Sequence, residues 1–204
     1  MQPRTHVISA RRTAGALLDP ARRLLNGLNG HWHRRALLLY AFVVTSHFLE
    51  HALQMGQVHA LGWSRPEAGG LLGLAFPGIA AAEVLHTTWN SLQLTGLILL
   101  LIGFRRVPAA RSWWLVALTL QTWHWFEHAV IQLQYVTGIY LYGAMRQMSI
   151  LERFIPRIEL HFLYNLVVFI PTLIAFIIYF RHRERAVARD ARGAACPSSI
   201  RELP

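Results

Sequence analysis

The chain has 204 residues, of which 54% are hydrophobic and only 15% are charged, and its formal net charge is +10. This composition is too apolar for an ordinary soluble domain and predicts an integral membrane protein. All twenty basic residues are arginines that flank apolar runs and form no stripe, so a nucleic-acid partner is not expected. The single cysteine, Cys196, excludes an intrachain disulfide and a Cys-rich zinc or iron–sulfur site.

Residues 1–35 form a basic N-terminal segment that is interrupted by glycine and proline. Within it, residues 21–28 have the pattern of a short amphipathic helix that would lie on an anionic membrane surface. A poorly ordered basic tail is the alternative. The segment has no apolar core followed by small residues, so we do not interpret it as a signal peptide.

Four apolar runs follow, each close to the roughly 20 residues that a helix needs to cross a bilayer. We expect transmembrane helices at residues 36–56, 79–104, 113–136 and 158–180. A further apolar stretch, residues 69–77, is too short to cross and is expected to be re-entrant or interfacial. The predicted fold is therefore an all-α integral membrane protein, a bundle of four transmembrane helices.

The arginines predict the orientation of these helices. Sixteen of the twenty lie in the N-terminal segment, in the short loop 105–112 or in the basic tail 181–204. By the positive-inside rule, both termini and the short loop are cytoplasmic. We expect the membrane to be a bacterial cytoplasmic membrane, with two apolar outer connections that fold back over the bundle.

One motif, His-x-x-Glu-His, occurs twice, each time in the middle of an apolar run. Its residues are His47, Glu50 and His51 in the first copy and His124, Glu127 and His128 in the second. On a helix, positions i, i+3 and i+4 share one face, so each copy directs two imidazoles and a carboxylate the same way. Ionisable groups at this depth are costly, and these types are ligands of transition metals.

A second pattern, His-x-x-x-Asn, also occurs twice, as His86 with Asn90 and as His161 with Asn165. The copies of the first motif are separated by 77 residues and those of the second by 75 residues. We interpret the two halves, residues 36–104 and 113–180, as a tandem repeat of one two-helix unit.

Helical rise places all of these residues at one depth. At about 1.5 Å per residue, the paired histidines of the first and third helices lie in the outer half of the bilayer. His86 and His161 lie within the first two turns of helices that return from outside, and so reach the same level. Six histidines and two glutamates are therefore predicted to meet in one site.

Each residue also has an ordinary structural interpretation. A lone imidazole such as His86 can bond a neighbouring helix carbonyl, and each His-x-x-Glu-His copy can form a buried hydrogen-bonded pair. The agreement in depth across four helices favours ligation. Asn90 and Asn165, one turn from the histidines, are predicted to orient a ligand or bound water, with helix–helix hydrogen bonds as the alternative. Glu83 is expected to be solvated, and His59 to lie at the surface.

Imidazole with carboxylate ligation suits iron, copper or zinc, and eight ligands related by a pseudo-twofold axis predict two ions. Two such ions with an open position would activate O₂ or water beside apolar side chains. We therefore expect a metal-dependent membrane oxidoreductase of the oxygenase, hydroxylase or oxidase type. It would act on an apolar substrate and take electrons from a donor or a partner membrane subunit.

Three alternatives stay open at this point. A haem-binding electron-transfer protein is disfavoured because paired i, i+4 histidines with an adjacent glutamate do not match one axial ligand per helix. A zinc or transition-metal transporter or sensor is disfavoured because the ligands stop at one depth. An accessory subunit of a larger membrane complex would leave no distinguishing pattern in this sequence.

Overall fold

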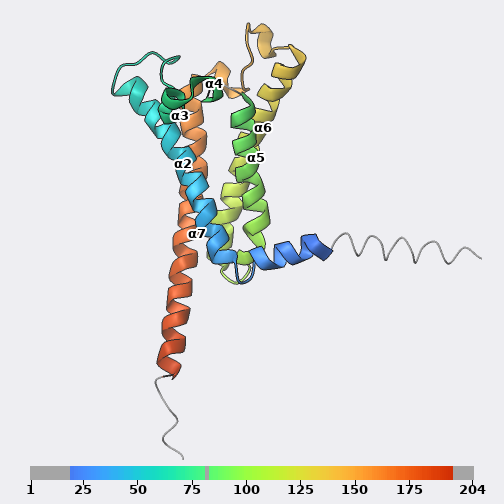
Figure 1. The fold of residues 1–204 in the computed structure, drawn as a ribbon, viewed down its shortest axis with the longest axis vertical. Coiled ribbons are helices and arrows are strands. Elements are labelled where there is room, and N and C mark those ends of the chain that lie inside the picture. Colours follow the sequence, from blue (N-terminus) through green and yellow to red (C-terminus); the bar gives the residue numbers. More distant parts are fainter. Residues whose placement is uncertain (1–18, 81–82, 195–204) are drawn as a thin grey trace, which may run out of the picture.

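The computed structural model describes residues 19–80 and 83–194 and contains helices but no strands in these ranges. Four long helices form a bundle (Figure 1): α2 (His33–His59), α5 (Glu83–Leu100), α6 (Pro108–Thr137) and α7 (Arg157–Ala194). The predicted all-helical fold is confirmed. Residues 1–18 of the predicted N-terminal segment, residues 81–82 and the end of the basic tail lie outside the described residues.

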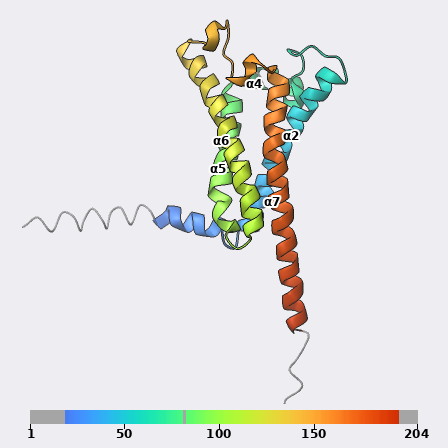
Figure 2. The ribbon, with the colours of Figure 1, turned by 180° about the vertical axis from the view of Figure 1, so that it is seen from behind.

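Successive long helices run in opposite directions, and their connections lie at two ends of the bundle (Figures 1 and 2). The end of the bundle that carries the two long connections, residues 60–82 and 138–156, is called the loop end. The first contains α3 (Gly70–Ala75) and α4 (Pro77–Ala80), and the second contains the short 3₁₀ helices η2 (Leu141–Gly143) and η3 (Leu151–Arg153). The opposite, terminal end holds the start of α2, the tight α5–α6 turn and the projecting end of α7.

Local sequence accounts for several helix boundaries. α6 begins with Pro108, whose missing N–H is no loss in the first turn of a helix. It ends at Gly138, which adopts the left-handed conformation (φ 68°) that glycine enters without a steric penalty. α5 is followed directly by the 3₁₀ helix η1 (Leu101–Phe104), which tightens the chain into the turn toward α6.

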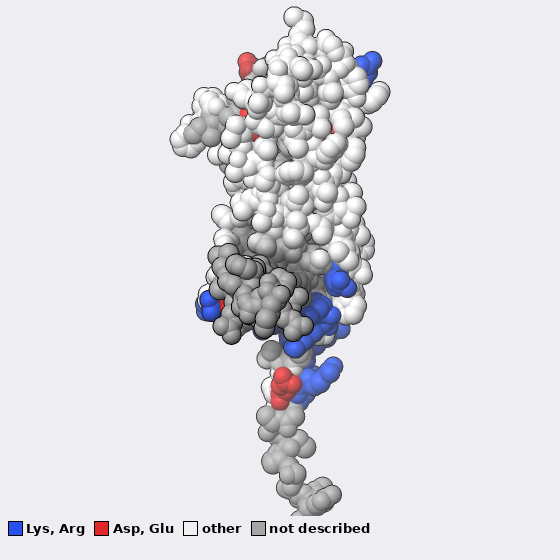
Figure 3. All heavy atoms as spheres, turned by 90° about the vertical axis from the view of Figure 1, so that its right-hand side faces the viewer, with Lys and Arg blue, Asp and Glu red and all other residues white. Residues whose placement is uncertain are grey.

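Three of the helices are long and apolar enough to cross a membrane: α2, α5 with η1, and the first part of α7. The finding is consistent with the predicted membrane protein. α6 is not among them, because its glutamines, histidines and Glu127 lower its hydropathy. Figure 3 shows the matching surface: charged atoms gather at the terminal end, and the long body above them is nearly free of charge.

Two helical segments extend beyond the predicted spans. α7 continues past the predicted span, residues 158–180, to Ala194, because its last turns consist largely of alanine and arginine, which favour helix in water. In the N-terminal segment, residues 19–28 are helical and lie across the axis of the bundle (Figure 1). A position on the membrane surface stays a prediction for this helix.

The apolar core fills the terminal half of the bundle. Its largest buried side chains include Leu37, Leu97, Phe104 and Trp114, each fully buried. The Trp114 indole N–H donates to the Leu97 carbonyl at 2.8 Å. A side chain at position 103 would collide with the imidazole of His33, so only glycine fits there. Aromatic packing fills this half, and most of its buried polar groups are paired, with His33 Nε2 as an exception.

The four helices do not pack evenly. α6 packs closely against both α5 and α7, and α2 packs mainly against α7, whereas the seam between α2 and α5 is the loosest of these contacts. The loose seam lies beside the residues that the sequence analysis singled out.

Candidate metal centre

Six histidines from four helices meet in the loop-end half of the bundle. α2 supplies His47 and His51, α5 supplies His86, α6 supplies His124 and His128, and α7 supplies His161. Ring centroids lie 5.0 Å apart for His128 and His161, 5.8 Å for His51 and His161, and 6.0 Å for His86 and His128. The structure thus brings all six predicted histidines into one cluster.

The tightest group is the triad of His124, His128 and His161. One ring nitrogen from each lies within 4.8 Å of the other two, and all three residues are at most 4% exposed. At metal–nitrogen bonds of about 2.0–2.1 Å, the ligand atoms of a tetrahedral ion are roughly 3.4 Å apart. Small side-chain rotations would therefore close this triad on one ion.

These imidazoles are poorly satisfied by the protein itself. Within the described part of the chain, both ring nitrogens of His124 and of His128 are buried without a hydrogen-bond partner. The Nε2 atoms of His47, His51 and His161 are buried and unpartnered in the same sense. A buried polar atom that is left without a hydrogen bond costs about 1–3 kcal/mol of stability. Several of them facing one cluster indicate a site built for an added ligand.

Hydrogen bonds orient two of these rings. His161 Nδ1 lies 2.8 Å from the Arg157 carbonyl oxygen, and His51 Nδ1 lies 2.8 Å from Gln54 Oε1. Both partners accept, so each Nδ1 carries the proton and donates. Nε2 of His51 and of His161 is then the unprotonated nitrogen, with its lone pair available to a metal.

The two glutamates of the motif bond to the loop-end connections. Glu50 Oε1 accepts the backbone N–H of Leu72 at 2.8 Å, in the first turn of α3. Glu127 accepts the backbone N–H of Ile150 at 2.6 Å and the hydroxyl of Tyr164 at 3.1 Å. These carboxylates were predicted as ligands, and the structure gives each of them a partner in or beside the loops.

Asn90 and Asn165 also have partners other than the imidazole rings. Each donates its side-chain N–H to the carbonyl of the histidine one turn earlier, at 3.0 Å to His86 and 2.9 Å to His161. Gln121 on α6 donates to the side-chain oxygen of Asn90 at 3.0 Å. The contact between Gln121 and Asn90 joins two helices, as in the helix–helix alternative, whereas the bond of Asn165 stays within α7.

Sequence reasoning missed four residues that the structure places around the cluster. Gln57 accepts the N–H of Gly70 at 2.8 Å, and Gln134 accepts the N–H of Leu141 at 2.9 Å, so each glutamine fastens one loop-end connection. Trp89 stacks on His47 with ring centroids 5.4 Å apart, and Tyr164 stacks on His124 at 4.8 Å. The missed signal was the spacing, since these pairs repeat the offsets of 77 and 75 residues.

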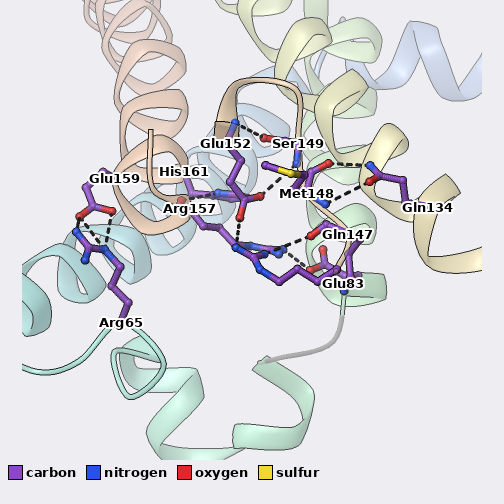
Figure 4. A network of polar contacts seen from close by, with 11 residues as sticks. Arg65, Glu83, Gln134, Gln147, Met148, Ser149, Glu152, Arg157, Glu159 and His161 are labelled. Atoms are coloured by element: carbon purple, nitrogen blue, oxygen red, sulfur yellow. Dashed lines mark hydrogen bonds and ion pairs between the residues drawn. The ribbon is translucent and has the colours of Figure 1, made fainter. Parts of the chain in front are cut away.

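Glu83 corrects a prediction, because it is 7% exposed and not solvated. Its carboxylate forms an ion pair with Arg157 at the start of α7 (Figure 4). A cavity of about 290 Å³ lies beside this pair and reaches His51, His86 and His161. Arg146, which is paired with Glu152 at 2.8 Å, also lines it. His59 is half exposed, as expected, and pairs with Glu159 at 3.2 Å.

A second cavity, of about 490 Å³, opens along the loose seam between α2 and α5. His47, Glu50, His51 and His86 line it together with apolar side chains. The histidine cluster is thus bordered by one polar cavity and one largely apolar cavity.

Comparison of the chain with models of protein families, with curated proteins and with solved structures found no match.

Proposed function

We propose that the chain is an integral membrane metalloprotein that holds two transition-metal ions in the histidine cluster and oxidises an apolar substrate. The observation that carries this proposal is the set of buried, unpartnered imidazole nitrogens that converge from α2, α6 and α7. A membrane interior tolerates such groups only when they serve a function. The triad of His124, His128 and His161 binds one ion, and His47, His51 and His86 bind the other.

The proposal includes α6 as the fourth transmembrane helix. Its polar side chains point into the bundle: Gln121, His124 and Glu127 are each at most 1% exposed. Its opposite face is apolar, with Phe126 and Leu133 exposed. An amphipathic helix of this kind crosses a membrane when its partners cover the polar face. The arginines at the terminal end then place both termini in the cytoplasm and the cluster in the outer half of the bilayer.

The two halves of the bundle are, in this proposal, copies of one unit. Equivalent residues make equivalent contacts: Glu50 and Glu127 accept loop N–H groups, and Gln57 and Gln134 fasten the same loops. Asn90 and Asn165 bond their own helices alike. Such correspondence in contacts supports duplication more strongly than spacing alone.

The donor set supports iron, copper or zinc and favours a nitrogen-rich coordination sphere, since both carboxylates have loop partners. A redox-active ion with an open position supplies the chemistry for activating O₂. Inserting one oxygen atom into a C–H bond consumes O₂, two electrons and two protons and releases water. The proposed activity therefore requires an electron donor, which would be a membrane partner or a reduced carrier.

The polar cavity supports a second candidate, binding of a metal ion for transport or sensing. It offers an ion a path to His51, His86 and His161 from the loop end. Against transport, the terminal half below the cluster is filled by apolar and aromatic side chains, among them Leu97, Trp114 and Phe176. A redox-inactive metal in the native protein would favour this candidate.

The test is elemental analysis combined with optical and EPR spectroscopy of the protein purified from membranes. We expect two ions per chain, at least one of them redox-active, and a loss of about one ion in His128→Ala. His59→Ala removes an exposed histidine and is the matched control, with unchanged metal content. A haem absorption band, or His128→Ala protein with the full metal content, would contradict the proposal.

A further inference from the structure

The apolar cavity along the α2–α5 seam has a wall and a floor of different chemistry. Six apolar side chains form most of the wall: Phe42, Leu49, Leu53, Leu71, Leu72 and Leu85. The floor is formed by His47, Glu50, His51 and His86. A cavity of about 490 Å³ lies in the range of roughly 300–1,000 Å³ that is typical of small-molecule sites.

The mouth of this cavity faces the surroundings of the bundle. Leu49 is 53% exposed and Leu71 is 62% exposed, and both also line the cavity. Because these side chains both line the cavity and face outward, they connect the cavity to the hydrocarbon around α2 and α5. Both helices are candidate membrane spans. A molecule dissolved in the bilayer would enter sideways, between two helices, without crossing water.

Comparison with the second half explains why the space exists. Ser46 lines the cavity, and the residue 77 positions later is Trp123. The Trp123 indole donates to the Tyr164 hydroxyl at 3.0 Å and packs beside Phe126, with ring centroids 5.8 Å apart. Tyr164, which accepts this bond, stacks on His124 with ring centroids 4.8 Å apart. A small residue in place of a tryptophan, together with the loose α2–α5 seam, leaves the first half open.

The lining also limits the charge of an occupant. It contains no arginine, and its one carboxylate, Glu50, would repel an anionic head group at short range. The arginines near the cluster, Arg146 and Arg157, line the separate polar cavity instead. Burying any charge among apolar side chains is also costly, so the apolar cavity suits a molecule that is uncharged along its whole length.

We propose that this cavity is the substrate site and that it takes a neutral molecule with a hydrocarbon chain from the bilayer. The chain lies against the leucines, and its reacting carbon is presented to the ion held by His47, His51 and His86. This inference rests on the proposed function. In this inference the substrate meets the ion held by His47, His51 and His86 and not the second ligand set, which none of the described cavities of this size borders from the α6 side.

The experiment uses a neutral alkyl diazirine as a photoreactive probe on the purified full-length protein, with mass-spectrometric mapping of the labelled residues. We expect labelling concentrated on Leu49, Leu53, Leu72 and Leu85. Ser46→Trp copies the second half and fills the cavity, so labelling there should fall at least tenfold. Leu85→Trp fills the same space from α5 and should give the same result.

The matched control is Thr119→Trp. Thr119, like Ser46, bonds only its own helix through its hydroxyl, here to the Leu115 carbonyl at 3.1 Å, and it is exposed on α6. This variant should keep full labelling of the cavity. A carboxylate-bearing alkyl diazirine should label the cavity several times less than the neutral probe.

Two results would overturn the inference: labelling spread evenly over the lipid-facing leucines, or equal labelling of the cavity in the wild type and in both filled variants. Metal content is measured on the same samples and is expected to stay constant in all variants. A wild-type protein that labels in the cavity but holds no metal would contradict the proposed function and leave the cavity as a hydrocarbon site. The two failures are therefore distinguishable.

Discussion

The two halves of the bundle along its axis differ in how many buried polar groups they leave without a partner. At the terminal end, Asn29 donates to the Leu99 carbonyl at 2.7 Å and accepts from the Gly103 N–H at 2.7 Å, and Trp114 is likewise paired. His33 is an exception there, because its Nε2 is buried and has no partner among the described residues. At the loop end, both ring nitrogens of His124 and of His128 are unpartnered in the same sense. The loop half therefore concentrates the groups that lower the stability of the empty protein. Such a difference is typical of a scaffold that carries a site.

The largest expected effect is the loss of stability caused by a substitution in the apolar core of the terminal half. Trp114→Ala removes a fully buried indole and its hydrogen bond, and we expect a loss of about 3–5 kcal/mol in unfolding free energy. Thermal unfolding in detergent measures it. The metal content of the folded fraction should stay unchanged, because the cluster lies in the other half. A proportional loss of metal from folded protein would show that the two halves are not independent.

The next substitution lies in the loop half and should lower metal binding without lowering the stability of the metal-free protein. His128→Leu removes a ligand and two unpartnered nitrogens at once, so metal affinity should fall more than about 100-fold, beyond the loss typical of an outer-shell substitution. The metal-free protein should unfold at the same temperature as the wild type or higher, since an unsatisfied polar group has gone. Competition with a chelator and thermal unfolding give the two readouts. Lower stability of the metal-free variant would show that His128 has a structural partner.

A smaller effect separates ligands from loop anchors. Glu127→Ala removes the acceptor for the Ile150 N–H and should free the second connection at a cost of about 1.5–3 kcal/mol, with metal retained. Glu127→Gln keeps one oxygen to accept the Ile150 N–H and sets its NH2 against the Tyr164 hydroxyl, so it should cost less than Glu127→Ala, again with metal retained. Limited proteolysis of the loop measures how far the connection is freed, and elemental analysis measures whether the metal is retained. Loss of metal in Glu127→Gln would show that the Glu127 carboxylate is a metal ligand.

The smallest effect concerns the solvated turn at Ser64. The Ser64 hydroxyl and N–H donate to Glu67 at 2.6 and 3.1 Å and lower the pKa of that carboxyl. A lowered pKa means that the bond stabilises the turn above the ordinary value of about 4.3 and is lost as the pH falls through the folded value. Ser64→Ala should raise the pKa of Glu67, as measured by NMR titration, and leave metal binding unchanged. An unchanged pKa would show that the hydroxyl does not contribute.

The sequence predicted the histidine cluster well because helical geometry converts spacing into depth. His86 and His161 were placed beside His51 and His128 by counting residues along antiparallel helices, and the structure brings these four together. The span predicted at residues 158–180 says nothing of where the helix ends, and α7 continues to Ala194 because its charged last turns still favour helix. Four-helix spanning and the orientation of the termini stay predictions.

The partners of the glutamates lay beyond sequence reasoning. Glu50 and Glu127 bond backbone N–H groups of irregular loops, and a backbone donor leaves no mark in the amino-acid sequence. Glu83 was misplaced for a related reason: its partner, Arg157, begins a helix of the other half, and only the tertiary fold brings the starts of α5 and α7 together. Gln57 and Gln134 carried a usable signal, because they keep the spacing of the motif.

The projecting end of α7 determines how far its charges act. A helix of 38 residues is about 57 Å long, whereas the hydrocarbon layer is about 30 Å thick. The first arginine past the apolar run is Arg181, and Arg192 lies roughly 16 Å farther along the axis. That separation is about two screening lengths at physiological ionic strength. In the proposed membrane arrangement, Arg181 would therefore lie close enough to an anionic lipid surface to be attracted to it, whereas Arg192 would be screened from that surface.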